Sequence, residues 1–210
     1  MQADLSELVR ELLESTGWLD RTRGFARTMR RSTDHPGGLL LVGTPESEPW
    51  HLVAHLSDEA RESGVAEIAP TLVRWSAPPG APPHLAVTMA RLEAARRGET
   101  VLVVAEEAAP EALLERAADA RRQGATVLAM DAGDTELETV AHESLSVVTS
   151  DLVVPELSFD TVQHLVSAAA GDPELDRGAG RSTRTGVRGR LARALDTISG
   201  SPNRGETGWR

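Results

Sequence analysis

The chain has 210 residues, of which 40% are hydrophobic and 3% aromatic, and its formal net charge at pH 7 is −10. This length suits one domain with tails or at most two small domains, with a core built from Leu, Val and Ala. The absence of Cys excludes disulfides and thiolate metal sites, and no apolar run approaches the ~20 residues of a transmembrane helix.

Two helices are predicted before the first strand. The apolar residues of segment 5–13 recur at helical spacing, and Asp4 and Glu7 form a capping box before them. A second, Arg-rich helix is predicted over residues 18–31, followed by a turn over 33–38. These N-terminal helices, residues 1–31, are expected to pack on or pair with the core.

The middle of the chain alternates apolar runs with helical patterns. Residues 39–42 predict a buried strand, and Ser47 is a good N-cap for a helix that reaches residue 63. The next strand is predicted over 71–75, a Pro-rich loop over 76–83, and a helix over 84–97.

The stretch from 98 to 130 is the most informative part of the chain. Apolar runs at 101–105 and 126–130 flank a helical pattern, and a connection of that length makes the two strands parallel. After this stretch, the sequence predicts a short helix over 136–143, a fifth strand over 145–148 and a closing helix over 159–170. The order predicts an α/β fold, a three-layer αβα sandwich with a five-stranded, mainly parallel sheet over residues 32–171.

The tail, residues 172–210, differs from the body in charge. Residues 177–210 hold eight Arg and two acids, a balance of +6, whereas residues 1–176 carry −16. The tail composition is typical of disorder, apart from an amphipathic helix predicted over 187–199. Arg188, Arg190 and Arg193 lie mostly on the polar side of that helix, where they would contact a protein partner or an anionic surface such as a membrane or nucleic acid.

The segment 39–170 resembles the SIS (sugar isomerase) family of phosphosugar-binding αβα sandwiches. The sequence LLLVGTPES occupies the place of the family's first strand and its Gly- and Ser-rich loop. The Gly124-Ala125-Thr126 segment follows the family's "G-A-x-x-x-A-x-T" pattern, and SFDTVQHLVSAA resembles its closing helix. The resemblance implies a homodimer that binds a phosphosugar.

One loop departs from the family pattern. Family members hold a phosphate with the loop S-x-S-G-x-T after the third strand, and this chain has Ala105-Glu-Glu-Ala-Ala-Pro-Glu111 there. Every hydroxyl is lost, Pro110 removes an amide donor, and Glu106, Glu107 and Glu111 oppose an anion at a helix N-terminus. The phosphosugar site is therefore predicted to be degenerate.

Other residues offer weaker candidate sites. Gly43, Thr44 and Ser47 are either a residual ligand loop or an ordinary strand-to-helix turn. His164 lies in the closing helix, where some family isomerases carry a catalytic His, although a packing role is the simpler interpretation.

Aromatic and imidazole side chains give two further alternatives. His51 and His55 share a helix face but lack a third ligand at motif spacing, so surface histidines and no metal or cofactor are expected. Trp50 and Trp75 either line an apolar pocket or serve packing.

Three functions remain open on these grounds. The first is a non-catalytic, cytoplasmic, SIS-like binding or regulatory protein. The second is a divergent phosphosugar isomerase that uses Thr44, Ser47 and His164. The third is an adaptor that reaches a membrane, nucleic acid or protein through its basic tail.

Overall fold

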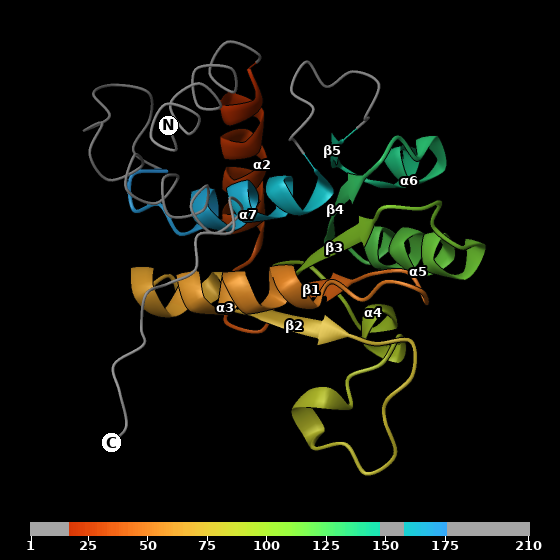
Figure 1. Cartoon of the computed structure of the whole chain (residues 1–210). Helices are drawn as coiled ribbons and strands as arrows, with labels where there is room; N and C mark the ends of the chain where they lie inside the picture. Colours follow the sequence, from red (N-terminus) through yellow and green to blue (C-terminus); the bar gives the residue numbers. More distant parts are fainter. Residues whose placement is uncertain (1–16, 148–157, 176–210) are drawn as a thin grey trace, which may run out of the picture.

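A computed structural model describes residues 17–147 and 158–175 of the chain (Figure 1). The helix predicted over 5–13 and the tail helix with Arg188, Arg190 and Arg193 lie outside the described residues. Among the described residues, no helix has both the length and the apolarity needed to cross a bilayer.

The centre of the fold is a five-stranded sheet in which every pairing is parallel, as the chain order predicted. The strands lie side by side in the order β2-β1-β3-β4-β5. Their bounds are β1 Leu39–Val42, β2 Pro70–Val73, β3 Thr100–Ala105, β4 Thr126–Asp131 and β5 Glu143–Ser146. The α/β fold class inferred from the sequence is thus confirmed.

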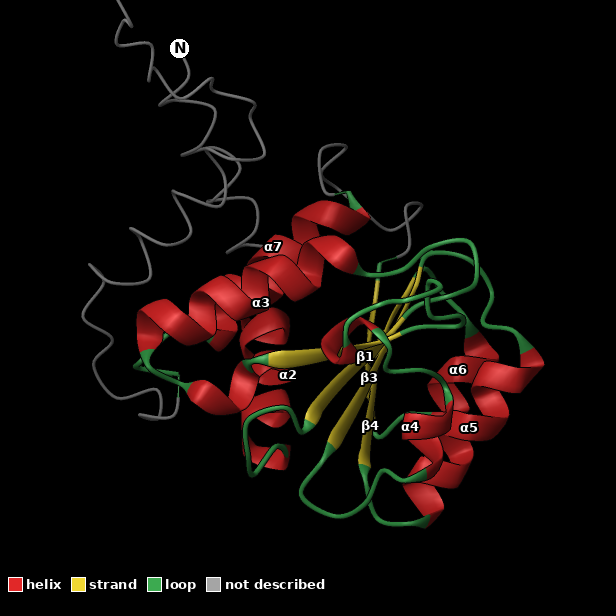
Figure 2. Ribbon diagram, turned by 90° about the horizontal axis from the view of Figure 1, so that it is seen from below, coloured by secondary structure: helices red, strands yellow, loops and turns green. Residues whose placement is uncertain are grey.

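Helices cover both faces of this sheet, which Figure 2 shows nearly edge-on between two groups of helices. One face carries α2 Trp18–Ser32, α3 Trp50–Ser63 and α7 Phe159–Ala170. The other carries α4 Ala90–Glu93, α5 Glu111–Arg122 and α6 Thr135–Val140. Two short 3-10 turns, Ala66–Ile68 and Pro83–Leu85, complete the described elements.

The central strands supply both halves of the core. In β1, Leu39 and Leu41 face the α2-α3-α7 layer, whereas Leu40 and Val42 face the α4-α5-α6 layer, and all four side chains are fully buried. Strands that are covered on both faces consist of continuous apolar residues, which is why the strand positions could be predicted from the sequence. Burying each Leu contributes on the order of 1.5–3 kcal/mol.

Two predicted helices are shorter in the structure. The helix expected over 84–97 is wrong, because only α4 forms there and the preceding loop bonds to the end of β2 instead. The amide of Arg74 donates to Val87 O, and the amide of Met89 donates to Arg74 O. A chain held to Arg74 through residues 87–89 cannot also be helical at those positions.

The helix expected over 136–143 ends at Val140, and the fifth strand begins earlier than predicted. Ala141 is extended, and Glu143 pairs with Leu128 of β4, so pairing with the sheet ends the helix. Strand β5 therefore starts at Glu143 instead of Leu145.

Candidate functional site

The strand order places a topological switch point between β1 and β3. The chain leaves β1 toward β2 and then returns past β1 to form β3. In open parallel sheets, ligands bind at such a point, outside the carboxyl ends of the strands. Here the edge is formed by the β1 loop, residues 43–49, and the β3 loop, residues 106–110.

The β1 loop is closed by its own hydrogen bonds. Thr44 is 2% exposed, and its hydroxyl oxygen accepts the amide of Ser47 at 3.2 Å. Ser47 is exposed. The Thr44 hydroxyl and the Ser47 amide are thus already hydrogen-bonded to each other.

The prediction that Ser47 caps the following helix is wrong. Helix α3 begins at Trp50 with Pro49 at the N-cap position, and no side chain caps it. A residue that precedes proline is kept out of the helical region, so Glu48 cannot be helical and a helix cannot start at Ser47.

Gly43 is required by this loop. A Cβ built on Gly43 would lie 2.0 Å from Ser47 O and 2.9 Å from Pro49 Cδ, so any side chain would break the turn. The carbonyl of Gly43 accepts the indole Nε1–H of Trp75 at 2.9 Å. Trp75 is therefore anchored to the loop and packs against the α4-α5-α6 core.

The arginine that follows β2 is already neutralised. Arg74 donates to both carboxylate oxygens of Glu48, at 3.0 and 2.8 Å, in a pair whose side chains are both largely buried. Its guanidinium lies 5.1 Å from the centre of the Trp50 ring, which is 50% exposed. A bidentate pair of this kind commits the arginine geometrically.

The β3 loop is acidic on its outside and satisfied on its inside. Glu106 and Glu107 are exposed, and Pro110 occupies the N-cap position of α5 without a side-chain cap. The amide of Ala109 donates to Asp134 Oδ2 at 2.7 Å. The other oxygen of Asp134 accepts the amides of Glu136 and Leu137, which makes it the N-cap of α6.

Asp131, at the end of β4, completes this acidic edge. Its side chain is fully buried, and Oδ1 accepts the amides of Gly133 and Asp134 at 2.8 and 3.1 Å. Asp131 Oδ2 is buried and, among the described residues, accepts no hydrogen bond. The carboxylates of Asp131 and Asp134 thus accept five backbone amides near the carboxyl ends of β3 and β4.

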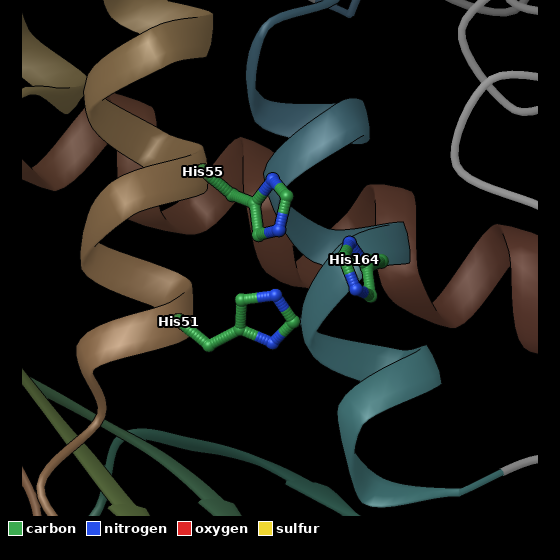
Figure 3. A group of neighbouring side chains, drawn as sticks. All are labelled: His51, His55 and His164. Atoms are coloured by element: carbon green, nitrogen blue, oxygen red, sulfur yellow. The ribbon is translucent and has the colours of Figure 1, made fainter. Parts of the chain in front are cut away.

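A second cluster lies between α3 and α7. Figure 3 shows His51 and His55 on α3 pointing toward His164 on α7. The ring centres lie 4.6 Å apart for His51–His55, 4.7 Å for His51–His164 and 4.2 Å for His55–His164. One ring nitrogen from each residue lies within 4.8 Å of the others, an arrangement that could hold a metal ion.

Burial and mutual proximity lower the pKa of two of these imidazoles. For His164, burial is the largest cause and the neighbouring His55 and His51 follow, and together, against the opposing effect of Asp160, they bring the pKa to about 4. The pKa of His55 is also lowered, first by burial and then by His51, whereas Asp58 acts in the other direction. No hydrogen bond within the described residues holds any of the three rings.

Sequence reasoning found the α3 pair but missed its third member. His164 is separated from His55 by more than a hundred residues, and only the packing of α7 against α3 joins them. The carboxylates Asp131 and Asp134 were also missed. An Asp at the end of a buried strand indicates an edge residue, and an Asp just before a short helix indicates an N-cap, so both signals were present in the sequence.

Comparison with known proteins supports the fold and nothing narrower. No family model matches the chain, and no curated protein matches it. A solved structure from Silicibacter pomeroyi DSS-3, described as a "putative phosphosugar isomerase", is similar with a TM-score of 0.51 and 16% identity over 95% of this chain. A protein of the same description from Salmonella typhimurium LT2 has a TM-score of 0.46 and 11% identity over 74% of this chain. The chain spans about half of each, 55% and 46% of their lengths.

Proposed function

We propose that this protein is a non-catalytic, SIS-like binding or regulatory module whose phosphosugar site is degenerate. The observation that carries the proposal is the satisfied state of the carboxyl edge. Asp134 accepts the amide of Ala109, and Asp131 accepts the amides of the next loop. These amides therefore already have carboxylate partners that a phosphate would have to displace.

The negative charge at the carboxyl edge also disfavours phosphate binding. Glu106 and Glu107 stand at the edge, and Arg74 is bound to Glu48. Each carboxylate about 4 Å from a phosphate charge costs roughly 1 kcal/mol in water and roughly 4 kcal/mol at a partly desolvated surface. Because Glu106 and Glu107 are exposed, the lower figure applies to each, and their combined repulsion offsets most of what a few amide hydrogen bonds return, at about 1 kcal/mol each.

The test is calorimetric titration of the full chain with a hexose 6-phosphate and, as the matched control, the same hexose without phosphate. We expect no phosphate-dependent binding at ligand concentrations up to about 1 mM. The double variant Glu106→Gln, Glu107→Gln removes two charges while it keeps the loop length. Phosphate-dependent binding by the unaltered chain, weakened by Thr44→Val, would overturn the proposal.

A divergent phosphosugar isomerase is the second candidate. It is favoured by one observation, the contact of His164 with the helix that follows the Thr44–Ser47 loop. This candidate predicts turnover of a phosphosugar that is lost in Ser47→Ala and in His164→Ala. Absence of turnover with aldose and ketose phosphates would leave the binding module as the function.

A further inference from the structure

We propose that His51, His55 and His164 form a binding site for a divalent transition metal, with Zn²⁺ as the best-matched ion. Three imidazole nitrogens would occupy three tetrahedral positions, and the fourth would remain open to water or to an exogenous anion. The inference goes beyond the proposed binding or regulatory function and does not depend on it, because the carboxylates and amides that carry that proposal include none of these three side chains.

The geometry requires only small adjustments. Zn–N bonds of about 2.0–2.1 Å at tetrahedral angles place ligand nitrogens about 3.4 Å apart. The nitrogens now lie within 4.8 Å of one another, so each must move by about 1 Å. His51 is exposed and His55 is partly exposed, so their side chains can rotate toward the buried His164 without repacking the core.

The helical framework fixes two ligands in advance. His51 and His55 are four residues apart on α3 and therefore share one face of that helix, the spacing by which two histidines of one helix reach a single zinc ion. The third ligand comes from α7, which packs against α3. Ligands from two packed helices give a site whose spacing the tertiary fold holds.

The ring nitrogens are chemically available. Metal ligation requires imidazole nitrogens that are free to bind, and each of the three residues offers one such atom to the cluster. Within the described residues, no nitrogen of the three rings takes part in a hydrogen bond, so metal binding would break no hydrogen bond there.

The donor set selects the ion. Imidazole suits Zn²⁺, Cu²⁺, Ni²⁺ and Fe²⁺, whereas Mg²⁺ and Ca²⁺ require oxygen ligands. Asp160 lies one turn before His164, and Asp58, which forms an ion pair with Arg61, lies about one turn after His55. Neither carboxylate bonds to a ring within the described residues, so their contribution is negative charge near the cation.

The experiment uses tag-free full-length protein, stripped of metal with a chelator and titrated with Zn²⁺ alone by calorimetry at pH 7.5. Parallel titration with Co²⁺ records the visible absorption of a tetrahedral nitrogen-ligated ion. We expect one ion per chain, an increase in Tm with Zn²⁺ and no response to Mg²⁺.

Two variants and one matched control decide the result. His51→Ala removes an exposed ligand without disturbing the core, and His164→Asn tests the buried one; each is expected to weaken Zn²⁺ binding by at least about 10-fold. His35→Ala, an exposed histidine at the opposite end of β1, is expected to bind as the unaltered chain does. Equal binding by His51→Ala and His35→Ala, or no stoichiometric binding by the unaltered chain, would overturn the proposal.

Discussion

The most informative single substitution is at Asp134, because one carboxylate joins two loops of the candidate edge. Asp134→Ala removes the N-cap of α6 and the acceptor of the Ala109 amide together. Loss of an N-cap costs about 1 kcal/mol, and a buried amide left without a partner costs about 1–3 kcal/mol. The expected loss in the free energy of unfolding is therefore about 2–4 kcal/mol, a large share of the roughly 5–15 kcal/mol of a typical domain.

Asp134→Asn separates the two contributions. Asn caps helices about as well as Asp, so the bonds to Glu136 and Leu137 survive. Its side-chain amide carries only one oxygen, so with the cap kept the Ala109 bond is lost, and an intermediate loss of about 1–3 kcal/mol is expected. Glu115→Ala, on the exposed face of α5, serves as the control and should change stability by less than about 0.5 kcal/mol.

Urea denaturation followed by circular dichroism at pH 7 gives these free energies, provided that the slope with denaturant stays constant among the variants. The order unaltered chain, Asn, Ala is the expected result. A loss below about 0.5 kcal/mol for Asp134→Ala would refute the view that this carboxylate satisfies the edge amides, and equal losses for Asn and Ala would show that the cap contributes nothing.

Three further predictions concern pH, the β1 loop and the core. The pKa of His164 is about 4 in the folded chain against an ordinary 6.5, so below pH 6.5 the unfolded chain binds a proton that the folded chain does not. The free energy of unfolding should therefore decrease as the pH falls from 6.5 to 4, and urea titrations across this range should show a smaller decrease for His164→Asn. Gly43→Ala places a methyl group against Ser47 O and should lower stability by about 2 kcal/mol or more, whereas Gly80→Ala, at an open turn, should cost less; thermal unfolding compares them. Leu102→Ala, at a fully buried position of β3, should cost about 2–5 kcal/mol in urea denaturation, and a loss under about 1 kcal/mol would contradict the central place of β3.

The layered α/β fold could be predicted from the sequence because the apolar patterns that indicate it are local. A strand buried on both faces is a continuous apolar run, and β1, β3 and β4 each show one. The helical spacing before and after them then implies parallel pairing, which all four strand pairs confirm. The starts of α3 and β5 were misplaced because Pro49 and the pairing of Glu143 override local preference.

The candidate sites were only partly legible. The acidic character of the β3 loop could be predicted directly, since Glu106, Glu107 and Pro110 lie within five consecutive residues of the chain. The bond from the Ala109 amide to Asp134 spans 25 residues and depends on two loops meeting at one edge of the sheet. No periodicity or spacing encodes that meeting.

The sequence by itself determined the five strands, the parallel sheet, most of the helices and the acidic composition of the β3 loop, because apolar periodicity and charge are local properties of the chain. The tertiary structure alone decided that His164 joins His51 and His55, and that Asp131 and Asp134 satisfy the amides of the edge. These contacts follow from how α7 packs on α3 and how the ends of β3 and β4 align. Such contacts depend on the path of the whole chain, and the local sequence around the residues that make them does not indicate which partners they will meet.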